Sequence, residues 1–180
     1  QAGVLARSQL QAGGFGPGPV RAAVAARRWQ SFGRHVVVLH NAALTAQQRQ
    51  WVAVLLPGKP AALAGATAAA LAGLTGYEDD DVHIVVALDS NAGYPPWVRV
   101  HNSRRFEPAH VASASPPRTS PARSVLDTAS WQPHVRRAVA ILCAGVQQRV
   151  TTAGRLAREL ESAGSIRHVG ILRAVIGDIG

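Results

Sequence analysis

The chain has 180 residues, 47% hydrophobic and 16% charged, which suffices for an ordinary buried core. Its one cysteine excludes an internal disulfide, and no apolar run is long enough to span a membrane. The net charge of +9 is concentrated at one end, because the first 77 residues contain seven basic residues and no carboxylate, whereas the remainder is nearly balanced. A one-sided positive field attracts polyanions such as nucleic acids.

The first forty residues carry two helical patterns with a break between them. Residues 5–10 predict a short helix, and the glycine-rich run at residues 13–18 ends it. Pro19 suits the first turn of a second helix that extends to about Arg28. The apolar side chains of this second helix fall on one face, and a different stripe carries Arg21, Ala25 and Arg28.

A basic hairpin is predicted directly after the second helix. The segment from Trp29 to His40 contains two short β-prone stretches around a turn at residues 31–34. We expect Trp29 to anchor the hairpin to the core rather than to stack on bases. Helix, glycine-rich turn, helix and hairpin is the order of a winged helix-turn-helix, so residues 1–40 are predicted to form a partial domain of this class.

The next segment, residues 41–118, is predicted to be a mixed α/β lobe. Thr45 and Gln48 form a capping box that opens a helix, and residues 61–74 favour a second helix rich in Ala and Gly. An acidic turn at residues 78–81 follows, which we interpret as solvated. The expected strands are Val82 to Leu88 and Trp97 to His101, and an irregular connection is expected over residues 103–120.

The last segment, residues 119–180, is predicted to be helical. Ser120 and Pro121 make a helix start, and an apolar helical rhythm recurs in three later stretches: residues 135–146, 151–160 and 166–176. Asp127 is expected to pair with Arg123, one helical turn earlier. The predicted fold class is therefore α+β, with a partial winged helix-turn-helix, a mixed lobe and C-terminal helices.

Both ends of the chain indicate a fragment. Gln1 stands where an initiator Met is expected, the first helical pattern has almost no lead-in, and the sequence stops abruptly at Gly180. With no signal peptide and no apolar span, we expect a cytoplasmic protein without membrane contact.

Five short blocks are spread in order over nearly the whole chain: ARSQL at 6–10, RWQ at 28–30, LAGATA at 63–68, VHNSRR at 100–105 and TSPARSVLD at 119–127. Together they make the chain resemble the AbiEi-type antitoxin-like proteins of actinobacteria, transcriptional regulators of type IV toxin-antitoxin systems. The resemblance implies a winged-helix DNA-binding domain whose first helix would precede Gln1, a second α/β lobe, and autoregulation of an operon.

Two alternatives stay open beside this regulatory function. In one, the helices from Val135 onward bind a cognate toxin or a further C-terminal domain, and DNA contact is vestigial. In the other, the chain is the non-catalytic targeting portion of a larger protein with a C-terminal restriction-endonuclease-like domain. The sequence favours no particular oligomeric state.

The residues predicted to contact DNA are Arg21, Ala25, Arg27, Arg28 and Arg34. On a helix in the major groove, the fork of an arginine can bond guanine in a bidentate manner. Arg34, at the tip of the hairpin, would meet phosphate or the minor groove. Arg27 is the weakest candidate because it falls near the apolar side of the helix. The alternative is that all four arginines are solvated surface residues.

No catalytic residue, metal site or cofactor is predicted. Ser120 and Ser124 lack the context of a nucleophile elbow, and the only lysine, Lys59, lies far from any carboxylate cluster that would suit a nuclease. No two histidines on one helix face have ligand spacing, although His83 and His101 lie on neighbouring predicted strands. We therefore expect that the chain is not an enzyme by itself.

Overall fold

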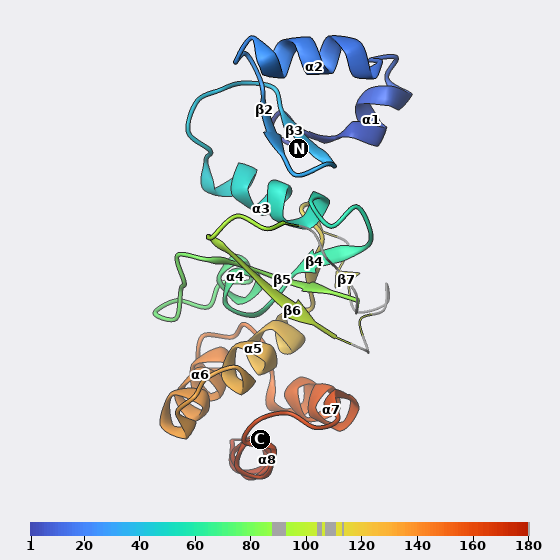
Figure 1. The fold of residues 1–180 in the computed structure, drawn as a ribbon. Helices are drawn as coiled ribbons and strands as arrows, with labels where there is room; N and C mark the ends of the chain where they lie inside the picture. The colour runs from blue at the N-terminus through green and yellow to red at the C-terminus, as the bar shows by residue number, and fades with distance from the viewer. Residues whose placement is uncertain (88–92, 104–105, 107–110, 113, 180) are drawn as a thin grey trace.

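The computed structural model describes residues 1–87, 93–103, 106, 111–112 and 114–179. Within these residues the chain forms eight helices and two β-sheets, so the predicted α+β class is confirmed. The chain runs from an N-terminal unit through a central sheet to a group of C-terminal helices (Figure 1). Among the described residues, no helix is both long and apolar enough to cross a membrane.

Residues 1–40, called the N-terminal unit below, fold around a three-stranded antiparallel sheet. Its elements are β1 (Val4–Ala6), α1 (Arg7–Ala12), α2 (Pro17–Ala25), β2 (Gln30–Phe32) and β3 (Val36–Val38), and the strand order is β1-β3-β2. The helix predicted from residue 5 is wrong at its start, because residues 5 and 6 belong to β1. This strand forms by pairing with β3, far along the chain, and local periodicity does not indicate such a contact.

The three valines of β3 are buried on both faces of this sheet. Val37 packs with Leu10 and Val20 of the two preceding helices, and Trp29 lies partly buried against this cluster, as expected. Val36 and Val38 belong instead to the core that contains α3 (Ala46–Leu55). Because neighbouring side chains of a strand point to opposite faces, the sheet is covered by α1 and α2 on one side and by α3 on the other.

The helix α3 begins with the predicted capping box. The Thr45 hydroxyl accepts from the Gln48 N–H at 3.3 Å, and the Gln48 side-chain oxygen accepts from the Thr45 N–H at 3.0 Å. The amide nitrogen of Gln48 also donates to the Ala2 carbonyl at 2.9 Å and lies 2.8 Å from His40 Nε2. One buried side chain thus starts the helix and ties it to the N-terminal unit.

The central sheet mixes parallel and antiparallel pairs. Its strands are β4 (Ala61–Leu63), β5 (Val82–Val86), β6 (Val98–Asn102), β7 (Val111–Ala112) and β8 (Arg118–Thr119), in the order β6-β5-β4-β8-β7. One face packs on α3 through an apolar cluster that includes Leu63 and Ile84. By strand alternation, the opposite face carries His83 and His101.

Two sequence predictions are wrong in this sheet. Residues 61–74 form β4 and then the short helix α4 (Gly65–Leu71) instead of one helix. Because β4 is buried between β5 and β8, strand pairing outweighs the helical propensity of its alanines. The connection predicted to be irregular, residues 103–120, contains β7 and β8. Its residues 104–105, 107–110 and 113 lie outside the described residues. Leu88, the predicted last residue of the strand that begins at Val82, also lies outside them.

The C-terminal helices are α5 (Pro121–Ser130), α6 (Val135–Gln147), α7 (Ala153–Ala163) and α8 (Val169–Asp178). They share a core that includes Leu126, Leu142, Leu156 and Leu172. The predicted start of α5 is confirmed, because the Ser120 hydroxyl accepts from the Arg123 N–H at 3.2 Å.

The predicted pair of Arg123 and Asp127 is also confirmed. The Arg123 Nε lies 2.8 Å and 2.9 Å from the two carboxylate oxygens of Asp127. Both side chains are largely covered, at 15% and 8% exposure. Asp127 therefore serves the structure of α5.

Candidate nucleic-acid interface

The outward face of α2 carries small side chains and one cation. Val20 and Ala23 are buried on the inner face. The exposed positions are Pro17, Gly18, Pro19, Arg21, Ala22 and Ala25. Small side chains leave the helix backbone accessible, so this face can approach the groove of a duplex closely. The predicted residues Arg21 and Ala25 lie on it one turn apart.

Arg27 and Arg28 lie beyond the end of α2, not on it as predicted. The helix ends at Ala25, and the backbone reverses at Arg27, whose φ is 53°. The Arg28 N–H donates to the Ala23 carbonyl at 3.0 Å, and the Arg27 N–H to the Val24 carbonyl at 3.0 Å. This is the hydrogen-bond pattern of a Schellman motif. Both arginine side chains are exposed just past the C-terminal end of the helix.

The left-handed backbone at Arg27 leads to a stability prediction. Glycine adopts this conformation without the clash that an L side chain meets, so Arg27→Gly should raise the free energy of unfolding by about 1 kcal/mol. Arg28→Gly removes the same charge at a residue whose φ is not positive, and it should not stabilise. Urea unfolding of both variants checks this. If Arg27→Gly is no more stable than Arg28→Gly, the strain expected at Arg27 is absent and the prediction is wrong.

Arg34 lies at the other end of the hairpin, with the whole of β2 between it and Arg28. Its neighbours pack on the central lobe. A Cβ added to Gly33 would lie 2.9 Å from the Leu56 side chain, and one added to Gly58 would lie 2.8 Å from the His35 ring. The turn is thus held against the segment that follows α3, and the structure does not bring Arg34 beside the outward face of α2.

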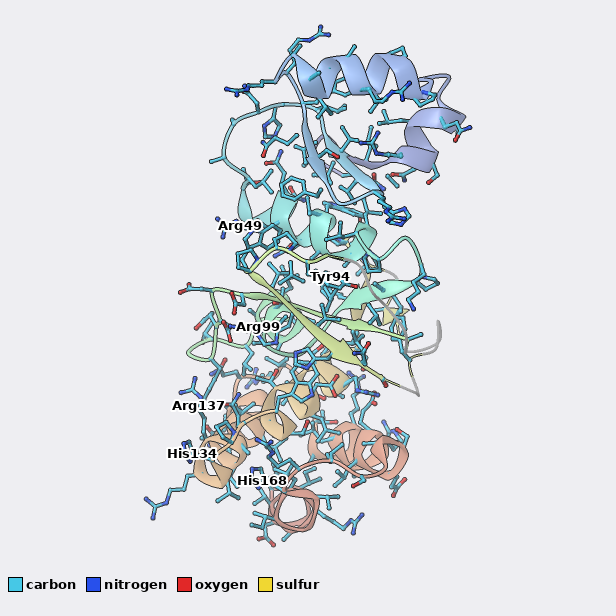
Figure 2. All side chains as sticks on the ribbon, viewed as in Figure 1. Arg49, Tyr94, Arg99, His134, Arg137 and His168 are labelled. Atoms are coloured by element: carbon cyan, nitrogen blue, oxygen red, sulfur yellow. The ribbon has the colours of Figure 1, made fainter. Side chains whose placement is uncertain are left out.

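A second contact joins the N-terminal unit to the central lobe. The rings of Phe32 and Trp97 meet edge to face with their centroids 6.4 Å apart. The guanidinium of Arg49, labelled on α3 in Figure 2, lies 5.5 Å from the centroid of the same Trp97 ring. The contact of Phe32 fixes the hairpin to the lobe, and Arg49 packs on the same Trp97 ring from within the lobe.

The positive charge of the N-terminal unit is not neutralised by its own side chains. The guanidinium groups of Arg21, Arg27, Arg28 and Arg34 are exposed and form no ion pair or hydrogen bond with other described residues. The first carboxylates of the sequence lie in the turn at residues 78–81, and two of them have cationic or imidazole partners outside the N-terminal unit. Asp81 pairs with Arg99, and Asp79 with His83.

The acidic turn is a hydrogen-bonded structure rather than only a solvated one. Hydrogen bonds from backbone N–H groups, with Gly76 among the donors, lower the pKa of Glu78. Partial burial raises the pKa of Asp79, but hydrogen bonds from the Asp81 N–H and from His83 outweigh it and lower that pKa.

His83 and His101, which the sequence placed on neighbouring strands, are in contact. His83 Nδ1 lies 3.0 Å from His101 Nε2, and His83 Nε2 lies 3.1 Å from Asp79 Oδ2. The two imidazole rings are 13° from parallel with their centroids 5.2 Å apart, so they lie edge to edge along the shared hydrogen bond. The facing nitrogens point at each other, and in this arrangement they do not converge on one metal ion.

Trp131 completes this cluster, which sequence reasoning missed. Its ring lies 3° from parallel to His101 with centroids 3.3 Å apart. The cluster lines a cavity of about 380 Å³ together with Tyr77 and Arg137. Burial, and then the nearby charge of His83, lower the pKa of His101 to about 4, so His101 is neutral at physiological pH.

Comparison with known proteins adds no assignment. No protein-family model matches the chain, and no curated protein matches it.

Proposed function

We propose that this chain is a DNA-binding transcriptional regulator that contacts duplex DNA through its N-terminal unit. One observation carries the proposal: a unit without a carboxylate presents a helix face of small residues around Arg21, with Arg27 and Arg28 directly beyond its end. Uncompensated arginines attract phosphates, and the small residues permit entry into a groove.

The arrangement of elements supports the same function. Two helices joined by a short turn precede a hairpin, and the first strand pairs with the last in the order β1-β3-β2. This order favours a winged helix-turn-helix whose second helix meets the DNA. Together with the resemblance to AbiEi-type proteins, it leads us to propose an antitoxin-like regulator that acts on its own operon and is not itself an enzyme.

The salt dependence of DNA binding tests the proposal. The logarithm of the observed binding constant should fall linearly with the logarithm of the salt concentration. The slope of this line should be close to minus one for each phosphate neutralised. The double variant Arg27→Gly and Arg28→Ala should reduce the magnitude of that slope by about two. An electrophoretic shift assay on a mixed-sequence duplex across a salt series measures both.

A matched control separates this surface from the total charge. Arg136 and Arg173 are exposed on α6 and α8, so replacing both with alanine removes the same charge elsewhere. The control variant should keep the slope of the native chain. An equal decrease in both double variants, or no binding by the native chain at low salt, would overturn the proposal.

A further inference from the structure

The composition of α2 limits what it can read in a groove. Its nine residues, PGPVRAAVA, contain a single side chain that is able to donate or accept hydrogen bonds, that of Arg21. This guanidinium is exposed at the middle of the outward face. The other outward side chains belong to proline, glycine and alanine, which offer only apolar contact.

The N-terminal end of α2 is also poorly suited to binding phosphate. A helix normally presents four unpaired N–H groups at its beginning, and these can bind an anion. In α2, Pro17 and Pro19 occupy the first and third helical positions, so two of those donors are missing. Gly16 at the N-cap provides no side-chain acceptor or donor. Phosphate binding therefore depends on arginine side chains rather than on the helix end.

Arg27 and Arg28 are placed to supply that binding. The Schellman turn carries them past the end of α2, and the Asn41 side chain donates to the Arg27 carbonyl at 2.7 Å, which holds the turn. They lie outside the helix face that would enter the groove. Contacts to phosphate position a protein without selecting a sequence.

From these features we propose that α2 reads a single guanine through Arg21, with Ala22 and Ala25 against thymine methyl groups. The inference rests on the DNA-binding function proposed above. The partner is then B-form DNA bound with low sequence selectivity, in sites that share one fixed G·C pair. One bidentate arginine-guanine contact contributes about 1 to 3 kcal/mol of discrimination, which corresponds to a preference of about five- to 150-fold.

Selection from a random duplex library tests this readout. The native chain should enrich one G·C position strongly and neighbouring thymines weakly. Arg21→Ala should still bind DNA but lose the enriched guanine. Arg28→Ala should bind more weakly at every sequence and keep the same guanine, because its contact is with phosphate. Circular dichroism of each variant establishes that it is folded.

The outcomes separate the two proposals. If the native chain binds no duplex, the proposed function fails. If it binds DNA without any enriched base, or with several fixed base pairs that persist in Arg21→Ala, the function stands and the single-guanine readout is wrong.

Discussion

Replacing Gly65 with alanine should destabilise the protein by about 3 kcal/mol or more, since backbone strain and overpacking add at this residue. Gly65 begins α4 with a φ of 50°, in the left-handed region that favours glycine. A Cβ built there would overlap Cζ3 of the Trp131 ring and would lie 2.7 Å from Cε3. The ring has little freedom to withdraw, because it is stacked on His101.

Substitutions at two other glycines separate the cost of backbone strain from the cost of steric overlap. Gly73 has a φ of 103° and open space around its missing Cβ, so Gly73→Ala should cost only the backbone strain, about 2 kcal/mol. Gly154 lies in α7 with open space and without a positive φ, so Gly154→Ala should be neutral or slightly stabilising. Urea unfolding monitored by circular dichroism ranks the three variants.

A second background keeps the test informative if Gly65→Ala does not fold. Trp131→Leu removes the aromatic ring, and in that background Gly65→Ala should cost no more than Gly73→Ala costs in the native chain. The steric explanation is wrong if Gly65→Ala and Gly73→Ala lower the free energy of unfolding equally in the native chain. It is also wrong if Gly65→Ala lowers that free energy as much in the Trp131→Leu background as in the native chain.

Gly65 also lies in a region where local sequence patterns do not suffice to predict the structure. The sequence predicted the class of fold, the capping box at Thr45 and the start of α5, because these depend on residues a few positions apart. It predicted one helix over residues 61–74, because alanine favours helix and nothing local indicates that β4 pairs with β5 and β8. The contact of Gly65 with Trp131 spans a similarly long stretch of sequence.

The candidate interface follows the same rule. Helical periodicity placed Arg21 and Ala25 on an outward face, and both lie there. The same periodicity wrongly extended the predicted helix to Arg28, although α2 ends at Ala25. A Schellman turn is usually marked by glycine, and here Arg27 occupies that position. The position of Arg34 depends on the packing of Gly33 against Leu56, a tertiary contact that no local pattern encodes.

The His83–His101 contact predicts a loss of stability in mild acid. An ionised carboxylate only accepts hydrogen bonds, so His83 Nε2 donates to Asp79, and the hydrogen bond between His83 Nδ1 and His101 Nε2 requires one of these two nitrogens to be unprotonated. The pKa of His101 is lowered from its ordinary value of 6.5 to about 4 in the folded chain. The folded state therefore binds fewer protons than the unfolded state between these values, and its stability falls as the pH decreases through that window.

Lowering the pH from 7 to 5 should reduce the free energy of unfolding by about 1 kcal/mol, less than the pKa shift alone corresponds to because His101 is partly exposed. The carboxylates Asp79 and Glu78 have pKa values lowered from 3.8 and 4.5, so the stability that they contribute is lost below this range. The histidine contribution is consequently separable from theirs, and urea unfolding at pH 7, 6 and 5 measures it.

His101→Gln keeps a hydrogen-bonding side chain but does not titrate, so its unfolding free energy should change less between pH 7 and 5 than that of the native chain. His134→Gln, at an exposed histidine just before α6, is the matched control and should retain the native dependence. If both variants follow the native profile, the acid sensitivity belongs to other groups. If the native profile is flat, the pKa of His101 is not lowered in the folded chain, and the prediction is wrong.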